Sequence, residues 1–332
     1  PSFLNASEEV ACGSGSWVGR IVVQALHVAG CKMAFDSDQK ETVSAPFANN
    51  LLMYLLGGKD QYGFPMAGMP MSTNAVGQGA RIDMDGEHAA GFFWAPVVDC
   101  PGIEEHEDKF PYLCLFRDRF DTNQAGLGKY RGGVGVTEAF TPHNLERMAM
   151  VSIGMGDHFT TNYGVFGGYA GPPNPRFVIK GSAVREMMAR TDEKLPYGLY
   201  ELTEGKPMGG EYLLAPSNEA AITYSPGDLF VLVNGSAGGY GDVLERDPEM
   251  VMKDLREGLI TPSVARQIYC VAWDEETGEA DRAKTEVLRV RAREDRKRRG
   301  KPFDEFVQEW SKKKPKDEIL KYYGNWPMPN DA

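Results

Sequence analysis

The apolar positions of this chain fall into short runs that glycine and aspartate interrupt. Several runs have the length and the β-branched or aromatic content of strands; they are YLCLF, GVGVTEAF, MVSIGM, RFVIK and LFVLVNG. Short strands joined by tight turns favour pairing between neighbours in the chain. The middle of the chain is therefore predicted to form an antiparallel or mixed sheet.

Near the N-terminus the pattern predicts a mixture of helix and strand. The segment WVGRIVVQALHVA, residues 17–29, has apolar positions at helical spacing. The run NNLLMYLLGG, residues 49–58, stops at a glycine pair, as helices often do. Residues 17–29 are therefore a plausible helix, the end of residues 49–58 is helix-like, and the first part as a whole is predicted to be mixed helix and strand.

Two short helices are predicted in EMVMKDLREGL and TPSVARQIY, with Gly258 between them. Thr261 is placed as the N-cap of the second helix, directly before Pro262. Beyond Trp273 the chain becomes basic, with ten Lys or Arg against three acidic residues between positions 282 and 301. This stretch lacks the aromatics of an RNA-binding arm and the apolar face of a membrane helix, so it is predicted to be a solvated helix or a subunit-docking arm.

The formal net charge of −11 argues against nucleic acid or an anionic membrane as the principal partner. No apolar run approaches the roughly 20 residues of a membrane span, and the N-terminus lacks the order of a signal peptide. A cytoplasmic location is expected. Because Pro1 is not an initiator methionine, the chain is expected to be a processed product or one piece of a longer polypeptide. The five cysteines have no CxxC spacing and are predicted to be buried free thiols; they are Cys12, Cys31, Cys100, Cys114 and Cys270.

The segment NGSAGGYGDVLERDPEMV, residues 234–251, superficially resembles a phosphate-binding loop. It lacks the Gly-Lys-Ser/Thr that supplies the cation and the magnesium ligand, and Gly241 is followed by Asp242, which would repel a phosphate. The GxGxxG pattern is also absent. A structural turn is favoured, in which Asp247 caps a helix that begins at Pro248.

A second glycine cluster, NQAGLGKYRGGVGV, includes two cations. Lys129 and Arg131, with the amides of Gly132 and Gly133, are candidates for binding an anion or a substrate carboxylate or phosphate. Turns beside strands have the same composition, so a β-turn scaffold remains the alternative. The third cluster, YGVFGGYAGPPNPRF, is predicted to be a turn-rich loop.

The five histidines show no HxH or HxxxH spacing. His88 lies among Asp83, Asp85 and Glu87, so it is a weak candidate for a metal ligand, and a solvated turn is the alternative. His106 lies between acidic residues and is predicted to sit in an exposed acidic loop that favours its protonated form. No GxSxG elbow or other nucleophile motif is present, so the residues alone assemble no active site.

The glycine clusters GKYRGGVGV and YGVFGGYAG, followed by GGYGDVLERDPEMVMKDLREGLITPSVARQIYCV, resemble the C-terminal half of the hydantoinase B/oxoprolinase family. The resemblance covers roughly residues 49–273. Within the family, DQYGFPMAG, DGEHAAGFFWAP and the tail YYGNWP are most similar to the large subunits of acetone and acetophenone carboxylases. The resemblance implies a subunit of an ATP-dependent ketone carboxylase.

In such an enzyme, a partner subunit of the hydantoinase A type binds ATP and Mg²⁺ and phosphorylates a small ketone and bicarbonate. The large subunit then joins the two to a β-keto acid. The family's metal ligands for Mn²⁺, Zn²⁺ or Fe²⁺ lie in the N-terminal half of the large subunit, and their segment does not occur here. The resemblance thus implies a second chain that carries this half, and no metal site in this chain apart from the weak candidate His88.

Two other functions stay open. One is an ATP-dependent amidohydrolase of the hydantoinase or 5-oxoprolinase type, and the other is a non-catalytic scaffold subunit. The expected fold is α+β, with mixed or antiparallel sheets, short helices and a C-terminal helical arm, as part of a larger subunit. Three parts are expected: residues 1–68 continue a domain begun in another chain, residues 69–275 form the β-dominated core, and residues 276–332 form a basic, aromatic docking arm.

Overall fold

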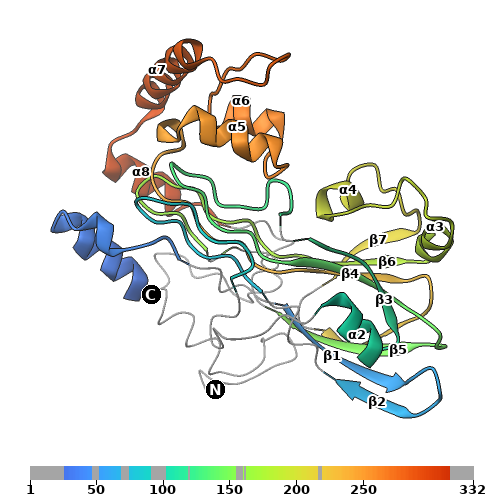
Figure 1. The fold of residues 1–332 in the computed structure, drawn as a ribbon. Coiled ribbons are helices and arrows are strands. Elements are labelled where there is room, and N and C mark those ends of the chain that lie inside the picture. Colours follow the sequence, from blue (N-terminus) through green and yellow to red (C-terminus); the bar gives the residue numbers. More distant parts are fainter. Residues whose placement is uncertain are drawn as a thin grey trace, which may run out of the picture. The chain divides into compact units, whose positions relative to one another are not determined.

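The computed structural model describes residues 26–46, 52–68, 75–90, 102–118, 120–154, 160, 162–215 and 219–314. The chain divides into two compact units, Pro1–Tyr269 and Cys270–Ala332. The described residues form two antiparallel sheets and short helices, which confirms the predicted α+β class (Figure 1). The division at residues 68 and 275 stays a prediction.

The first sheet has four antiparallel strands, in the order β2-β1-β5-β8. Their bounds are β1 Leu52–Lys59, β2 Pro65–Gly68, β5 Met148–Gly154 and β8 Glu219–Tyr224. The long pairing in this sheet joins β1 to β5, where Tyr54 lies opposite Ser152. Strands that are far apart in the chain are therefore neighbours in space.

The second sheet has five antiparallel strands, in the order β3-β4-β9-β6-β7. Their bounds are β3 Tyr112–Asp118, β4 Thr137–Pro142, β6 Arg176–Lys180, β7 Glu211–Ala215 and β9 Leu229–Val233. Every one of the predicted strand runs contributes to one of the two sheets. The strand prediction is thereby confirmed, although its glycine-rich segment before Thr137 is extended chain outside the sheet.

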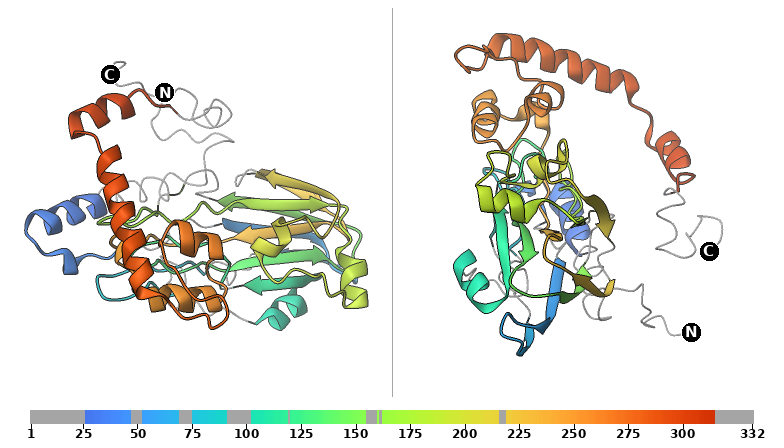
Figure 2. Two further views of the ribbon diagram at one scale, coloured as in Figure 1. Left: turned by 90° about the horizontal axis from the view of Figure 1, so that it is seen from above. Right: turned by 90° about the vertical axis from the view of Figure 1, so that its right-hand side faces the viewer.

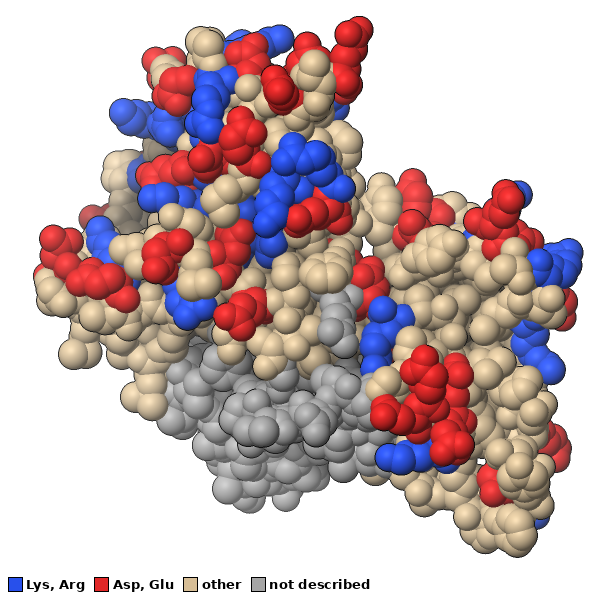
Figure 3. Space-filling model, in the orientation of Figure 1, with Lys and Arg blue, Asp and Glu red and all other residues tan. Residues whose placement is uncertain are grey.

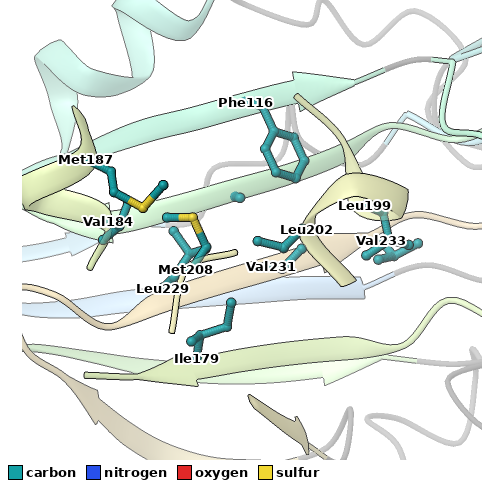
Figure 4. Close-up of a cluster of buried hydrophobic side chains, with 11 residues drawn as sticks. Phe116, Ile179, Val184, Met187, Leu199, Leu202, Met208, Leu229, Val231 and Val233 are labelled. Atoms are coloured by element: carbon teal, nitrogen blue, oxygen red, sulfur yellow. The ribbon is translucent and has the colours of Figure 1, made fainter. Parts of the chain in front are cut away.

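The two sheets pack face to face around one apolar core, and α3 (Val184–Arg190) and α4 (Leu199–Thr203) cover the other face of the five-stranded sheet (Figures 2 and 4). Strand β9 is buried on both faces: Phe230 and Leu232 join the core between the sheets, whereas Leu229, Val231 and Val233 lie under the helices. A strand buried on both sides needs apolar residues at every position. The uninterrupted run LFVLV has this composition.

The helix indicated by the end of residues 49–58 is wrong, because Leu52–Lys59 is strand β1. Tyr54 and Leu56 are buried, while Leu55 between them is 42% exposed, so the side chains alternate as they do in a strand. The glycine pair lies inside the strand, where Gly57 pairs with Ala67 of β2 and with Ala149 of β5. Pairing on both edges decides the structure here.

The exposed loop predicted around His106 is also wrong. Ile103–Lys109 form helix α2, and His106 is buried. The carboxylate of Glu107 accepts a hydrogen bond from the backbone N–H of Cys114 in β3, at 2.7 Å. Burial, with the nearby charges of Arg117 and Lys109, lowers the pKa of His106 to about 4, so the imidazole is neutral rather than protonated.

Helices α5 (Pro248–Arg256) and α6 (Pro262–Gln267) confirm the predicted pair. The Asp247 carboxylate accepts from the N–H of Glu249 at 3.1 Å, and the Thr261 hydroxyl accepts from that of Val264 at 3.4 Å. Gly258 ends the turn between them with a φ of 75°. Both predicted N-caps are therefore present.

In the second unit the basic stretch forms helix α7 (Arg282–Arg299), followed by α8 (Phe303–Trp310). Figure 3 shows one face of the molecule, on which basic and acidic side chains are interspersed. The described part of the first unit also includes a helix over residues 26–36 and two short helical turns, η1 (Lys40–Thr42) and η3 (Val243–Glu245). None of the described helices is both long and apolar enough to cross a membrane.

Three predicted thiols, Cys31, Cys114 and Cys270, are free and partly buried. The other two cysteines lie outside the described residues, as do the first part of the helix predicted for residues 17–29 and the aromatic tail LKYYGNWP.

Candidate functional site

The glycine clusters form a layer of extended segments that run side by side beneath α5 and α6 (Figure 1). We call residues 75–80, 126–136, 162–171 and 234–241 the glycine layer. Backbone hydrogen bonds join its segments. The N–H of Gly77 donates to Gly235 O at 3.0 Å, that of Gly126 to Ala237 O at 3.0 Å, and that of Val165 to Gly239 O at 3.0 Å.

Glycine is required in this layer because the segments approach too closely for a side chain. A Cβ atom at Gly77 would lie 1.9 Å from the carbonyl oxygen of Gly133, and one at Gly133 would lie 1.8 Å from that of Glu87. The same holds at Gly132, where the nearest carbonyl oxygen belongs to Ala237 at 2.1 Å. The clusters serve close backbone packing.

The two candidate amides, and several others of this layer, already have protein acceptors. The N–H of Gly132 donates to Gly126 O and that of Gly133 to Gln78 O, both at 2.8 Å. In residues 234–241, Gly239 donates to Tyr169 O and Gly241 to Val165 O, both at 3.0 Å. This agrees with a structural role for the segment NGSAGGYGDV, because a phosphate loop needs amides that point at the ligand.

A buried charged cluster anchors the layer to α5. Arg246 is fully buried and donates from Nη1 and Nη2 to the two oxygens of Asp85, and from Nη2 to Asp254, all at 2.7 Å. Arg131 donates from Nε to Asp254 Oδ1 at 3.0 Å. Tyr269 places its ring 5.9 Å from the Arg246 guanidinium. Two cations and two carboxylates thus neutralise one another.

The electrostatics of this cluster follow from its geometry. Burial alone would raise the pKa of Asp85, but the hydrogen bonds and charges of Arg246 and Arg131 outweigh it and hold this pKa below its usual range. Burial raises the pKa of the Tyr269 hydroxyl. Asp85 is therefore ionised and Tyr269 neutral, and the cluster offers no group poised for proton transfer near neutral pH.

The four residues of the candidate anion site, Lys129, Arg131, Gly132 and Gly133, all lie on residues 126–136 of the glycine layer. Arg131 is buried, and its guanidinium faces Asp254. The Lys129 ammonium lies 5.7 Å from the Tyr130 ring, and within the described part of the chain no carboxylate forms an ion pair with it. Of the four candidates, Lys129 is the one whose charge is available. Whether it binds an anion stays a prediction.

His88 forms a hydrogen bond with the backbone. Its Nδ1 accepts a hydrogen bond from the Val134 N–H at 3.1 Å, which leaves the proton on Nε2. Burial and the charge of Arg131 lower the pKa of His88 to about 4. Asp85 is occupied by Arg246, so these residues do not fit a metal centre. Among the described residues no group of three His, Cys, Asp or Glu is arranged to hold a metal ion.

Sequence reasoning missed the roles of Asp85, Arg246 and Asp254. A signal for Asp254 exists in the periodicity of α5, since it follows the buried Val251 by three positions and so shares its buried face. A carboxylate on an apolar helix face predicts a buried cation opposite. Asp85 carried no comparable signal, because its partners lie far away in the chain.

Curated relatives of this chain include enzyme subunits. It is 34% identical, over 98% of its length, to the acetophenone carboxylase delta subunit of Aromatoleum aromaticum, and 29% identical, over 81%, to the acetone carboxylase alpha subunit of Xanthobacter autotrophicus. It is also 29% identical, over 67%, to caprolactamase subunit beta of Pseudomonas jessenii. The chain spans 48%, 35% and 34% of these relatives, half their length or less.

Solved structures support the same relationship. The nucleotide-free structure of acetone carboxylase matches 83% of this chain and 37% of its own, with a TM-score of 0.73 and 26% identity. The ATP-dependent caprolactamase of Pseudomonas jessenii matches 78% of this chain and 40% of its own, with a TM-score of 0.59 and 24% identity, which shows a common fold. The hydantoinase B/oxoprolinase model matches residues 1–243. The chain therefore belongs to the hydantoinase B/oxoprolinase family, as the resemblance of its glycine clusters predicted.

Proposed function

We propose that this chain is the C-terminal part of the large subunit of a cytoplasmic, ATP-dependent ketone carboxylase. The observation that carries the proposal is the 34% identity to the acetophenone carboxylase delta subunit over 98% of the chain. Because that relative is about twice as long, the proposal includes a second chain that supplies the N-terminal half. It also includes a hydantoinase A-type subunit that binds ATP and Mg²⁺.

The chemistry has a clear physical reason. Bicarbonate is a poor electrophile and a ketone a poor nucleophile near neutral pH, and phosphoryl transfer activates both. The activated ketone carbon then attacks the carboxyl carbon, which loses its phosphate. Hydrolysis of the enol phosphate releases the second phosphate as the ketone carbonyl re-forms. Bond formation requires the two reactants to be held together with water excluded. We assign to this chain the rigid framework for that step, built on the glycine layer, with Lys129 as the candidate contact to a substrate phosphate or carboxylate.

The metal belongs to the other chain in this proposal. His88 has its Nδ1 occupied, and Asp85 is bound by Arg246, so the described residues offer no set of ligands for Mn²⁺, Zn²⁺ or Fe²⁺. The residues of this chain hold and orient, and no step of the reaction is assigned to a metal bound by them.

The decisive experiment isolates the native complex and identifies its subunits by mass. We expect one partner with an ATP site and one with a His/Asp metal segment. The complex should consume acetone or acetophenone only when ATP and bicarbonate are both present. Purification of an active complex that hydrolyses 5-oxoproline, a hydantoin or caprolactam, without consuming a ketone, would overturn the proposal.

The relationship to caprolactamase subunit beta favours a second candidate function, the ATP-dependent opening of a cyclic amide. The same assays separate the two, because amide hydrolysis needs ATP but no bicarbonate. Incorporation of labelled bicarbonate into an acid product would exclude the hydrolase.

A further inference from the structure

Two carboxylates meet at the end of strand β3. Asp118 is the last residue of the strand and Asp121 follows it by three positions. Both point at the backbone of Gly198, directly before α4: a Cβ atom there would lie 2.5 Å from Asp118 Oδ2 and 2.9 Å from Asp121 Oδ1. We call Asp118 and Asp121 the acid pair. The absence of a side chain at Gly198 lets the pair approach the start of α4.

The hydrogen bonds of the acid pair leave one oxygen unsatisfied. Asp118 Oδ1 accepts from the Phe120 N–H at 2.7 Å, and Asp121 Oδ1 accepts from the Leu199 N–H at 2.8 Å. Asp121 is only 1% exposed, and its Oδ2 has no hydrogen-bond partner among the described residues. A buried carboxylate oxygen without a donor is costly, and more so beside a second carboxylate.

Among the described residues, the groups that face the pair supply no compensating charge. Thr137 of β4 offers a neutral hydroxyl, and α4 offers the backbone N–H of Leu199. The nearest described cation on β3, Arg117, forms an ion pair with Glu138 of β4. Within the described ranges, neither Asp118 nor Asp121 forms an ion pair. A proton is the simplest positive charge that fits.

We propose that Asp118 and Asp121 share one proton, which joins the loop after β3 to helix α4. With the proton on Asp121, its Oδ2–H donates to the partly buried Asp118, and the buried oxygen of Asp121 is satisfied. The two side chains interact directly, and neighbouring carboxylates cannot both ionise cheaply, as in other carboxylate pairs. Burial, with a contribution from the charge of Asp118, raises the pKa of Asp121 to about 7. Loss of the proton therefore occurs within the physiological range.

The same loop is also bonded to a second place in the fold. Thr122 donates from its hydroxyl to Gly258 O at 2.7 Å, and the N–H of Asn123 donates to Leu259 O at 2.9 Å. Both acceptors lie in the turn between α5 and α6. Loss of the shared proton places two adjacent negative charges between the loop and α4, so the link to α4 loosens while the link to α5 and α6 is retained.

The test is amide hydrogen exchange of the full chain, measured by mass spectrometry at about pH 5.5 and about pH 8.5 and corrected for the intrinsic dependence on pH. In the native protein, the corrected exchange of α4 is expected to rise about tenfold at the higher pH. In Asp121→Asn the amide donates to Asp118 and still accepts from Leu199, so exchange should be slow at both values. Asp83→Asn, which neutralises an exposed acid, is the matched control and should behave as the native protein does.

Three outcomes overturn the proposal. The first is corrected exchange in α4 that is equal at both pH values in the native protein, and the second is exchange in Asp121→Asn that still changes with pH. The third is exchange that millimolar MgCl₂ or CaCl₂ slows in the native protein but not in the variant, because this would assign a metal ion in place of the proton. If Asp121→Asn does not fold, Asp118→Asn gives the same test, because its amide donates to an ionised Asp121 and removes the titration near neutral pH.

Discussion

Arg246 donates to both oxygens of Asp85, with each N···O distance at 2.7 Å. This bidentate pair joins a turn near residue 85 to the start of α5 from the protein interior, since the Arg246 side chain has no exposed surface. Asp254 completes the arrangement by accepting from Arg246 and Arg131. The fold of the first unit therefore depends on a guanidinium group that water does not reach.

Asp254→Ala is predicted to lower the free energy of unfolding by about 3–5 kcal/mol, because it leaves two buried guanidinium groups with one carboxylate between them. Urea unfolding followed by circular dichroism measures the change. Asp36→Ala removes the exposed partner of Lys32 and should cost less than about 1 kcal/mol. Equal effects of the two substitutions would show that the buried cluster has no special importance for stability.

Gly77→Ala is predicted to cost at least about 3 kcal/mol or to prevent folding, because the new methyl group would lie 1.9 Å from a backbone oxygen. Backbone cannot move aside as a flexible side chain does. Gly30→Ala is the control: it lies in a helix with open space around it and should gain about 0.5–1 kcal/mol. Thermal unfolding of both variants checks the contrast, and a stable Gly77→Ala would contradict the close packing of the layer.

His106 is predicted to make the fold sensitive to acid. Its pKa is about 4 in the folded protein against an ordinary value of 6.5, so the unfolded chain binds its proton first. The stabilisation is complete above the unfolded pKa and is lost as the pH falls toward 4, by an amount on the order of 2 kcal/mol.

His106→Gln should reduce the difference in melting temperature between about pH 7 and about pH 5. The measurement is best made in the Asp121→Asn background. Asp121 has a raised pKa, so its ionisation lowers stability as the pH rises, which is the opposite sign. A pH dependence that is unchanged by His106→Gln would mean that the imidazole is not held neutral.

Lys129→Ala tests the candidate anion site. Because the Lys129 side chain is only partly buried and has no described carboxylate partner, the free energy of unfolding should change by less than about 0.5 kcal/mol. If Lys129 contacts a substrate phosphate or carboxylate, turnover by the assembled complex should fall at least about tenfold. Lys253→Ala on the exposed side of α5 is the control. Full activity of an assembled Lys129→Ala complex would favour a scaffold role.

Local chemistry explains which elements the sequence predicts. Helices α5 and α6 begin where an Asp-Pro and a Thr-Pro pair supply an N-cap and a fixed φ, and these signals need no partner elsewhere. The run LFVLV is apolar at every position because helices and a second sheet cover its strand. Here local preference and tertiary structure agree.

The failures come from long-range contacts. Residues 52–59 are a strand because β2 and β5 pair with both edges, and no local pattern reveals those partners. The environment of Arg131 was likewise hidden, since its carboxylate partner is Asp254, far along the chain. A cation among glycines looks free to bind an anion until the fold supplies an internal one.

The glycine layer also constrains how the chain folds. Its hydrogen bonds join residues near 77, 126 and 165 to residues near 237, so they cannot form until the last segment, ending at Gly241, has arrived. Closing such long loops is slow, because ordering entropy is lost before the contacts that compensate for it are made. During synthesis, the earlier segments are thus expected to remain solvated while Gly241 is still inside the ribosome. The layer is then one of the latest parts of the first unit to form.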